Sequence, residues 1–296
     1  MAPPLVSIGL PTYNRAASLE RAARSALAQD WSELELVISD NGSDDETQAV
    51  CEALRDADPR VRYMRQAANL GPLRNFEEVL EHSRGELFMW LGDDDSLDPS
   101  YVSECASVLL ANVDHTLVCG RARYYRHGTF AFAERDVNLL ADSPTRRLVG
   151  FYRQVTLNGA FYGVMRRSQV VQVPLVGGVG GDWLLVAHLA FLGKVQTLRS
   201  TSVHRSLGGS SQDAASLADL HGVPRMRSGN WQLAVARNAR QDVVERPVYS
   251  VLPRWRRRLL GAYAFALVVA RFSLKTWVGS ALARLGLFDR ARRLLE

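Results

Sequence analysis

Short apolar runs alternate with amphipathic stretches along the first third of the chain. Four runs are mostly apolar and end at Gly, Pro or charged residues, which favours buried strands over helices: 5–10, 34–39, 61–64 and 86–91. Between the first two, apolar residues recur at the i, i+3 and i+4 spacing of a helix: Leu19, Ala22, Ala23, Ala26 and Leu27. Further helices are predicted near Asp45 and just after Pro99. This alternation predicts an α/β fold whose ligands gather at the carboxyl ends of parallel strands.

A polar motif follows each of the four predicted strands. In chain order the motifs are Pro11-Thr12-Tyr13-Asn14, Asp40-Asn41-Gly42-Ser43, Asn69-Leu70-Gly71-Pro72-Leu73-Arg74 and Asp93-Asp94-Asp95. The last is a run of three carboxylates, which repel one another and lose hydration unless a positive group lies between them. Oxygen ligands of this kind suit Mg²⁺ or Mn²⁺, although a solvated acidic turn explains the triplet alone equally well.

In this order and within the first 95 residues, the four motifs resemble those of glycosyltransferase family 2, which is inverting and depends on nucleotide sugars. The resemblance implies a GT-A nucleotide-diphospho-sugar transferase fold, a Rossmann-like mixed sheet flanked by helices. It also implies transfer of a hexose from a UDP- or dTDP-linked sugar to an acceptor hydroxyl, with Mg²⁺ or Mn²⁺ held at a D-x-D motif. The acceptor class stays open between a glycan, a lipid-linked molecule and a small molecule.

The resemblance also implies which residues bind the nucleotide sugar. They are Pro11, Thr12, Tyr13, Asn14, Asp40, Asn69, Gly71, Arg74, Asp93, Asp95, Trp183 and Arg205. Asp40 can accept a hydrogen bond from a pyrimidine imide, and a carboxylate makes that bond stronger. Arg74 can hold a base carbonyl or a phosphate oxygen. From the residues alone, Asp40 is equally a turn-forming residue and Arg74 a surface arginine on a helix.

Asp94 is the expected direct metal ligand, with Asp93 near the ribose or a metal-bound water and Asp95 near the sugar or the metal. The family usually has an acid in place of Gly92, and a histidine in place of Leu207. His204 or Arg205 is expected to supply the contact that Leu207 loses, so His204 is a further candidate metal ligand. A flexible Gly/Ser-rich linker explains the segment from Gly208 to Ser211 nearly as well.

Asp182 is the expected general base, followed by Trp183 and an apolar helix. The family usually has a Glu-Asp pair at this place, and here Gly181 replaces the Glu. The alternative interpretation of Asp182 is a helix N-cap, where Asp is favoured because it accepts backbone N–H bonds.

Composition fits a catalytic domain over 1–211 with a helical extension over 212–296. The chain is 47% hydrophobic, enough for one sizeable core. Its three cysteines lack metal-ligand spacing and are expected to be reduced. The amino terminus lacks the charged region of a secretory signal, so we expect a cytoplasmic protein, peripheral at the inner face of the cell membrane if the extension binds lipid.

Within the extension, residues 253–296 begin with a basic cluster from Arg254 to Arg258. A 12-residue uncharged run from Leu259 to Ala270 follows, too short to span a membrane. Apolar and basic residues interleave from Trp277 onward. This pattern favours either a helix on an anionic membrane surface or a helical hairpin that packs on protein, including a homodimer. The net charge of +5 accompanies no recognisable nucleic-acid motif, so nucleic acid is not an expected partner.

Two other functions stay open. A sugar nucleotidyltransferase shares a nucleotide-binding α/β fold, but its Gly-rich basic loop after the first strand is missing here. A non-catalytic sugar-nucleotide-binding scaffold would explain why Gly92, Gly181 and Leu207 replace polar residues of the family.

Overall fold

The computed structural model describes residues 3–207 and 231–284, with side chains up to residue 271. The chain divides into two compact units, Met1–Arg225 and Met226–Glu296. The predicted domain boundary at 211 and 212 and the segment from Gly208 to Ser211 lie outside the described residues. The side chains of the basic amphipathic stretch from Trp277 onward also lie outside them.

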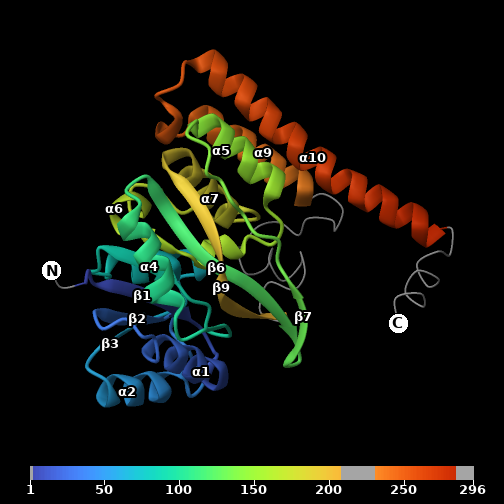
Figure 1. Ribbon diagram of the computed structural model, residues 1–296. Helices are drawn as coiled ribbons and strands as arrows, with labels where there is room; N and C mark the ends of the chain where they lie inside the picture. The colour runs from blue at the N-terminus through green and yellow to red at the C-terminus, as the bar shows by residue number, and fades with distance from the viewer. Residues whose placement is uncertain (1–2, 208–230, 285–296) are drawn as a thin grey trace. The chain divides into compact units, whose positions relative to one another are not determined.

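The first unit alternates strands and helices, as the sequence predicts (Figure 1). Its strands are β1 (Val6–Thr12), β2 (Leu34–Asp40), β3 (Val61–Arg65), β4 (Leu87–Trp90), β5 (Ser96–Leu97), β6 (His115–Arg126), β7 (Thr129–Ala133), β8 (Val164–Arg166) and β9 (Lys194–Leu207). Its helices are α1 (Ala16–Leu27), α2 (Thr47–Ala57), α3 (Pro72–Glu81), α4 (Tyr101–Ala111), α5 (Pro144–Gln154), the 3₁₀ turn η1 (Gly159–Tyr162), α6 (Arg167–Val170) and α7 (Gly181–Leu192). The predicted strands correspond to β1 to β4 and the predicted helices to α1, α2, α4 and α7, so the α/β class is confirmed.

Nine strands of the described residues form one mixed sheet in the order β3-β2-β1-β4-β8-β6-β9-β5, with β7 paired to β6. β1 runs parallel to β2 and to β4, whereas β8 lies antiparallel between β4 and β6. In Figure 1 the long strands β6 and β9 cross the unit, and β7 extends along one end of β6. The register pairs Thr12 with Asp40, so the carboxyl ends of β1 and β2 meet at the same edge of the sheet.

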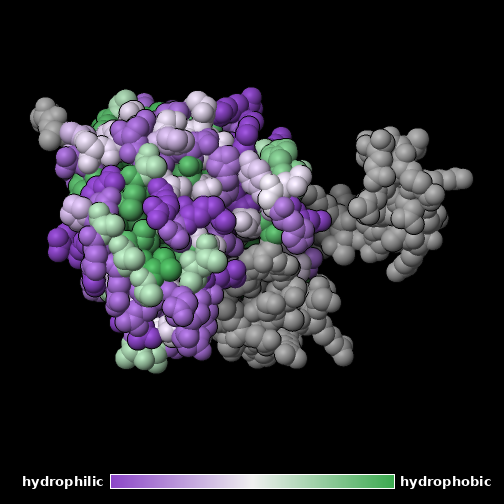
Figure 2. All heavy atoms as spheres, turned by 90° about the horizontal axis from the view of Figure 1, so that it is seen from below, coloured by the Kyte–Doolittle hydropathy of each residue, from purple (hydrophilic) through white to green (hydrophobic). Residues whose placement is uncertain are grey.

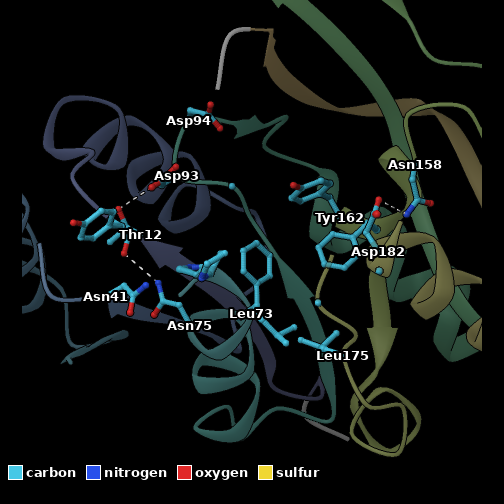
Figure 3. Close-up of a pocket in the computed structure, with 18 of the residues that line it drawn as sticks. Thr12, Asn41, Leu73, Asn75, Asp93, Asp94, Asn158, Tyr162, Leu175 and Asp182 are labelled. Carbon is cyan, nitrogen blue, oxygen red and sulfur yellow. Dashed lines mark hydrogen bonds between the residues drawn. The ribbon is translucent and has the colours of Figure 1, made fainter. Parts of the chain in front are cut away.

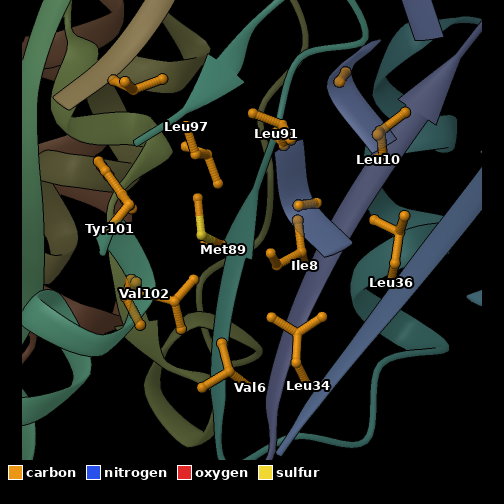
Figure 4. Close-up of a cluster of buried hydrophobic side chains, with 14 of the residues drawn as sticks. Val6, Ile8, Leu10, Leu34, Leu36, Met89, Leu91, Leu97, Tyr101 and Val102 are labelled. Carbon is orange, nitrogen blue, oxygen red and sulfur yellow. The ribbon is translucent and has the colours of Figure 1, made fainter. Parts of the chain in front are cut away.

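Both faces of the central strands are buried, as expected for parallel strands covered by helices. On one face, side chains of β1, β2 and β4 such as Ile8 and Met89 meet Tyr101 of α4 (Figure 4). On the other face Gly9 allows close approach, since a Cβ there would lie 2.8 Å from Val79 of α3. The predicted reduced cysteines are free and buried in this core: Cys51, Cys105 and Cys119. On the face seen in Figure 2, hydrophilic side chains surround a band of apolar ones, and such a mixture is normal for a folded domain.

The second unit contains α9 (Trp231–Glu245), the 3₁₀ turn η2 (Pro247–Tyr249) and α10 (Arg254–Arg284). α9 and α10 pack closely, because Gly261 has no side chain and a Cβ there would lie 2.9 Å from the Arg240 carbonyl oxygen. The Arg257 guanidinium also donates to the Val244 carbonyl at 2.9 Å. Within the described residues, none of the helices has the length and the apolar run that a membrane span requires.

Candidate functional site

A cavity of about 670 Å³ opens at the carboxyl ends of β1 and β4, within the size range of ligand sites. Its walls come from the loops after β1, β2, β3 and β4, the start of α3, η1, the Gly-rich loop before α7 and the end of β9. In Figure 3, Thr12, Asp93 and Asp94 lie on one side of the view, and Tyr162 and Asp182 lie on the other. Strand-end motifs far apart in the sequence therefore meet at one cavity.

Nine of the residues predicted to act in the site line this cavity: Pro11, Thr12, Tyr13, Asn14, Asn69, Asp93, Asp94, Asp182 and Arg205. The other predicted residues do not line it: Asp40, Gly71, Arg74, Asp95, Trp183 and His204. Several lining residues with polar side chains are not among the predicted ones: Arg15, Asn41, Asn75, Asn158, Tyr162 and Ser206.

Hydrogen bonds join the end of β1 to the turn after β4 and to α3. The Thr12 hydroxyl donates to Oδ2 of Asp93 at 2.8 Å, which joins the end of β1 to the turn after β4. The Asn75 amide of α3 donates to the Thr12 carbonyl at 3.1 Å. Beneath them, Trp90 of β4 stacks on Phe161 of η1, with ring centroids 5.0 Å apart. These contacts fix the wall of the cavity that carries the acidic turn.

Asn41, rather than Asp40, reaches the cavity from the end of β2. Its amide donates to Oδ1 of Asn69 at 2.8 Å, and its carbonyl accepts from the Leu70 amide at 2.9 Å. Asp40 is fully buried and accepts from the Ser43 amide at 2.9 Å. Alternation along a strand explains the difference, because neighbouring side chains point to opposite faces.

Asp40 makes two more contacts away from the cavity. It accepts from the Tyr63 hydroxyl at 3.2 Å and pairs with Arg65, whose Nε lies 3.3 Å from Oδ2. The structure therefore places Asp40 where it holds the turn after β2 and the neighbouring strand β3, in line with the turn-forming alternative.

Arg74 also lies away from the cavity. It forms ion pairs with three acids of its own helix, Glu77, Glu78 and Glu81. The arginines that line the cavity are Arg15 and Arg205. Glu77 and Glu78 lie three and four residues after Arg74, the helical spacing that brings side chains within reach, in line with the surface-arginine alternative.

The acidic triplet is divided between two surroundings. Asp93 and Asp94 line the cavity, and burial raises the pKa of Asp93 to about 7, with a further rise from the Asp94 charge. Burial and then the Asp95 charge raise the pKa of Asp94. In the described part of the chain no side chain donates a hydrogen bond to the Asp94 carboxylate. Two adjacent carboxylates with raised pKa values favour a cation or a proton at this place.

Asp95 instead contacts residues of β9. It is buried, its Oδ2 lies 2.9 Å from Nε of Arg205, and its Oδ1 accepts from the Ser206 amide at 3.1 Å. The Arg205 guanidinium also donates to the Tyr162 hydroxyl at 3.0 Å and lies 4.1 Å from the centre of that ring. Arg205 is thus held in a fixed orientation on the cavity wall.

The structure does not bring His204 to the acidic turn. Its Nε2 lies 2.7 Å from Oδ1 of Asp98, and its Nδ1 lies 2.9 Å from the Tyr125 hydroxyl. Both ring nitrogens are therefore engaged, whereas a histidine needs one free nitrogen to bind a metal. The strand alternation again explains this, since Arg205 and His204 point to opposite faces of β9.

Asp182 lies in the first turn of α7 and lines the cavity, but Gly180 is the N-cap residue of that helix. The Asn158 amide donates to Oδ2 of Asp182 at 2.9 Å (Figure 3). Burial raises the pKa of Asp182, against the hydrogen bond from Asn158, the Trp183 amide and the Arg205 charge. Trp183 is buried and lies edge-on to Phe151 rather than on the cavity wall.

A family model described as "Glycosyl transferase family 2" matches residues 7–171, more than half of the chain. The chain belongs to glycosyltransferase family 2. The match covers the four strand-end motifs and ends before Asp182, so the resemblance drawn from those motifs is confirmed.

Relatives with assigned names are similar to the same part of this family 2 chain. The GalNAc(5)-diNAcBac-PP-undecaprenol beta-1,3-glucosyltransferase of Campylobacter jejuni is 30% identical over 168 residues, 56% of this chain and 52% of the relative. The chondroitin synthase of Pasteurella multocida is 37% identical over 116 residues, 39% of this chain and 12% of the relative. The chain thus spans about half the length of the first relative and far less of the second.

Solved structures share the fold. The structure of S. aureus TarS 1-349 in complex with UDP-GlcNAc has a TM-score of 0.65 at 16% identity, covering 90% of this chain and 73% of that one. The mannosyltransferase PcManGT from Pyrobaculum calidifontis, in complex with GDP-Man and Mn2+, has a TM-score of 0.52 at 16% identity, covering 99% of this chain and 81% of that one. At these identities the likeness shows the fold, and the predicted GT-A fold is confirmed.

Two glycines explain how this family 2 chain shapes its cavity. Gly71 has φ +85°, a left-handed conformation that favours glycine, and it precedes the α3 residues that line the cavity. Gly181 lies directly against the preceding loop, since a Cβ there would lie 1.8 Å from the Val176 carbonyl oxygen. No larger residue fits at 181 in this conformation, which accounts for the absence of the family's usual Glu.

Proposed function

We propose that the protein transfers a sugar from a nucleoside diphosphate sugar to an acceptor hydroxyl, with inversion at the anomeric carbon. The observation behind it is that one cavity brings the strand-end motifs of family 2 together with the half-buried carboxylate of Asp182. A scaffold that only binds sugar nucleotides has no need of a carboxylate whose pKa is raised by burial.

The nucleotide is proposed to bind along the wall formed by the end of β1 and the loops after β2 and β3. Thr12, Asn41 and Asn69 offer hydroxyl and amide groups there, which suit the carbonyls and hydroxyls of a base and a ribose. We favour a UDP-linked sugar, since the TarS structure holds UDP-GlcNAc. The PcManGT structure holds GDP-Man, so the test must include purine donors.

The acidic turn fits Mg²⁺ or Mn²⁺. Asp94 is the proposed ligand and Asp93 the second acid beside it, because both line the cavity and hard oxygen ligands suit these ions. Among the described residues no three His, Cys, Asp or Glu side chains form a metal site by themselves. Such an ion would complete its ligands with water and the donor diphosphate, whose leaving charge it would stabilise. The PcManGT structure contains Mn2+.

Asp182 is the proposed general base. The acceptor hydroxyl attacks the anomeric carbon as the bond to the diphosphate breaks, and Asp182 takes the hydroxyl proton in the same step. A single displacement of this kind inverts the anomeric configuration. Burial makes Asp182 a stronger base than an exposed aspartate, which brings its pKa closer to neutral pH. Arg205, fixed by Asp95, is placed to compensate negative charge in the cavity.

The acceptor is proposed to be lipid-linked, with the protein at the inner face of the cell membrane. The Campylobacter jejuni relative is named for a PP-undecaprenol substrate. In α10, Trp255, Leu259 and Tyr263 recur every four residues and are 59%, 64% and 41% exposed. Arginines flank this stripe at Arg254 to Arg258, as in helices that lie on anionic membranes. A homodimer through the same stripe is the alternative.

The test is release of nucleoside diphosphate from a panel of UDP-, dTDP- and GDP-sugars, with Mn²⁺, Mg²⁺ or EDTA, in the presence of polyprenyl-linked acceptors. We expect UDP release and a product whose anomeric linkage is opposite to that of the donor. Binding of UDP-sugars without any turnover would favour the scaffold. Pyrophosphate release from a nucleoside triphosphate and a sugar phosphate would favour a nucleotidyltransferase.

A further inference from the structure

Asn158 is the direct hydrogen-bond partner of Asp182 in the cavity. It is only 1% exposed and lines the cavity, and its amide donates to Oδ2 of Asp182 at 2.9 Å (Figure 3). A donor at this distance fixes the orientation of a carboxylate and favours its ionised form. Asn158 therefore holds the Asp182 carboxylate in one orientation, and its hydrogen bond opposes the rise in pKa that burial causes.

The conformation of Asn158 serves this contact at a cost in stability. Its backbone has φ +59°, in the left-handed region that Asn and Gly tolerate better than other residues. Its buried carbonyl oxygen Oδ1 has no hydrogen-bond partner in the described part of the chain. A buried acceptor without a partner costs free energy, about 1–3 kcal/mol. Features of this kind cluster at functional sites, where another part of the structure holds them in place.

Glu134 is the residue that holds Asn158. Its Oε1 accepts from the Leu157 amide at 2.7 Å and its Oε2 from the Gly159 amide at 2.8 Å, so one carboxylate binds the backbone on both sides of Asn158. Oε1 also accepts from the Thr156 hydroxyl. Glu134 is itself buried and does not line the cavity.

Both ends of this clamp are fixed to the sheet. The Glu134 amide donates to the Ala122 carbonyl of β6 at 2.8 Å. Gly159 lies so close to β6 that a Cβ there would be 2.4 Å from Cβ of Ala122 and 2.6 Å from Oε2 of Glu134. The loop therefore has little room to move away from Glu134, and Asn158 has little room to move away from Asp182.

We propose that Asn158 and Glu134 are positioning residues for the general base: Glu134 clamps the loop 156–159 and Asn158 orients the Asp182 carboxylate. This inference rests on the proposed function, because it assigns a role relative to Asp182. Neither residue belongs to the strand-end motifs, and the family match says nothing of their role. Within residues 3–207, the other charged or titratable groups that face Asp182 are Arg205 of β9, which favours its ionised form, and Tyr162 of η1.

Asn158→Gly tests the contact, because Gly tolerates the left-handed backbone and only the amide is lost. Glu134→Gln tests the clamp. The NH₂ group of the glutamine replaces one carboxylate oxygen, and it cannot accept a hydrogen bond from the backbone N–H that it faces. Asp136→Asn is the matched control. Asp136 is a nearby carboxylate, 9% exposed, that pairs with Arg121 instead of the loop.

Two readouts distinguish positioning from a merely structural role. The first is a ¹³C NMR titration of the Asp182 carboxyl carbon, assigned by its loss in Asp182→Asn. The second is the pH profile of kcat/KM. We expect Asn158→Gly and Glu134→Gln to move the Asp182 titration and the acidic limb of the profile to higher pH. We expect kcat to fall about 10- to 100-fold with donor KM unchanged. Asp136→Asn should leave the titration and the profile in place.

If Glu134 acts through Asn158, the double variant should have the same kcat as Asn158→Gly alone. The proposal is overturned if Asn158→Gly titrates and turns over like the wild type, or if Asp136→Asn shifts the profile equally. If Glu134→Gln does not fold, Glu134→Asp keeps both oxygens with a shorter reach and should give a smaller shift of the same sign. If the wild type transfers no sugar, the proposed function fails, while the titration still decides whether Asn158 controls Asp182.

Discussion

Replacing Gly181 by alanine should lower turnover, because the added methyl group distorts the cavity. Gly181 begins α7, and a Cβ there would lie 1.8 Å from the carbonyl oxygen of Val176. Carbon and oxygen atoms that are not bonded approach to about 3.3 Å. Gly181→Ala must therefore move the loop or the start of α7 by roughly 1.5 Å, the difference between these two distances. Val176 and Asp182 both line the cavity, so either movement changes the site.

We expect Gly181→Ala to lower kcat about 100-fold, since a displacement of about 1 Å of a catalytic group costs that much. Overpacking should lower the free energy of unfolding by about 1–3 kcal/mol. Gly177→Ala in the same loop is the matched control. Its Cβ would lie 3.2 Å from the end of the Leu73 side chain, which can rotate away. The control should keep near-normal turnover and lose less than about 1 kcal/mol of stability.

The assay is steady-state kinetics with donor and acceptor varied separately, together with urea unfolding of each variant. Donor affinity should change little in Gly181→Ala, because the strand-end wall is not displaced. If Gly181→Ala and Gly177→Ala behave alike, the contact between the Gly-rich loop and α7 does not control the site, and our account of the missing Glu is wrong.

Three further predictions concern the metal, the arginines and the second unit. Asp94→Ala should abolish turnover stimulated by Mn²⁺ or Mg²⁺ because the diphosphate loses its counter-charge; unchanged activity in EDTA and in this variant would make the triplet only a turn. Arg205→Ala leaves the buried Asp95 without its ion-pair partner and should lower the free energy of unfolding in urea by about 3–5 kcal/mol. Arg74→Ala on the surface should lower it by less than about 1 kcal/mol. Equal losses for the two variants would contradict these placements. Deleting residues from 253 onward should release the protein from anionic liposomes without changing donor binding. If the full chain does not bind liposomes and the deletion unfolds the first unit, the extension packs on protein instead.

The fold could be predicted because its signals are local. Each central strand is a short apolar run ended by a polar motif, so β1 to β4 lie within two residues of the predicted ranges. The apolar residues with i, i+3, i+4 spacing, Leu19 to Leu27, all lie in α1. The same motifs gave the candidate site, since the carboxyl ends of parallel strands meet at one edge. Thr12, Asp93 and Asp94 follow from this rule.

The remaining site residues depend on which face each side chain takes and on distant contacts. A motif such as Asp40-Asn41 does not show which of the two reaches the cavity, and the structure gives Asn41. Arg74 has acidic neighbours at helical spacing, a signal that could have marked it as a surface residue. Asn158 and Glu134 carry no sequence signal, because their roles arise from two loops brought together by the fold.

The central claim is that Asp182 is the general base of sugar transfer, and Asp182→Asn tests it most directly. Burial raises the folded-state pKa of Asp182, so its ionised form at neutral pH disfavours folding, and the neutral Asn should not lower stability. The Asn carbonyl can still accept from Asn158. We predict that nucleoside diphosphate release at saturating donor and acceptor falls at least about 100-fold, with donor affinity unchanged and Tm not lowered. A variant that keeps the wild-type rate would contradict the account.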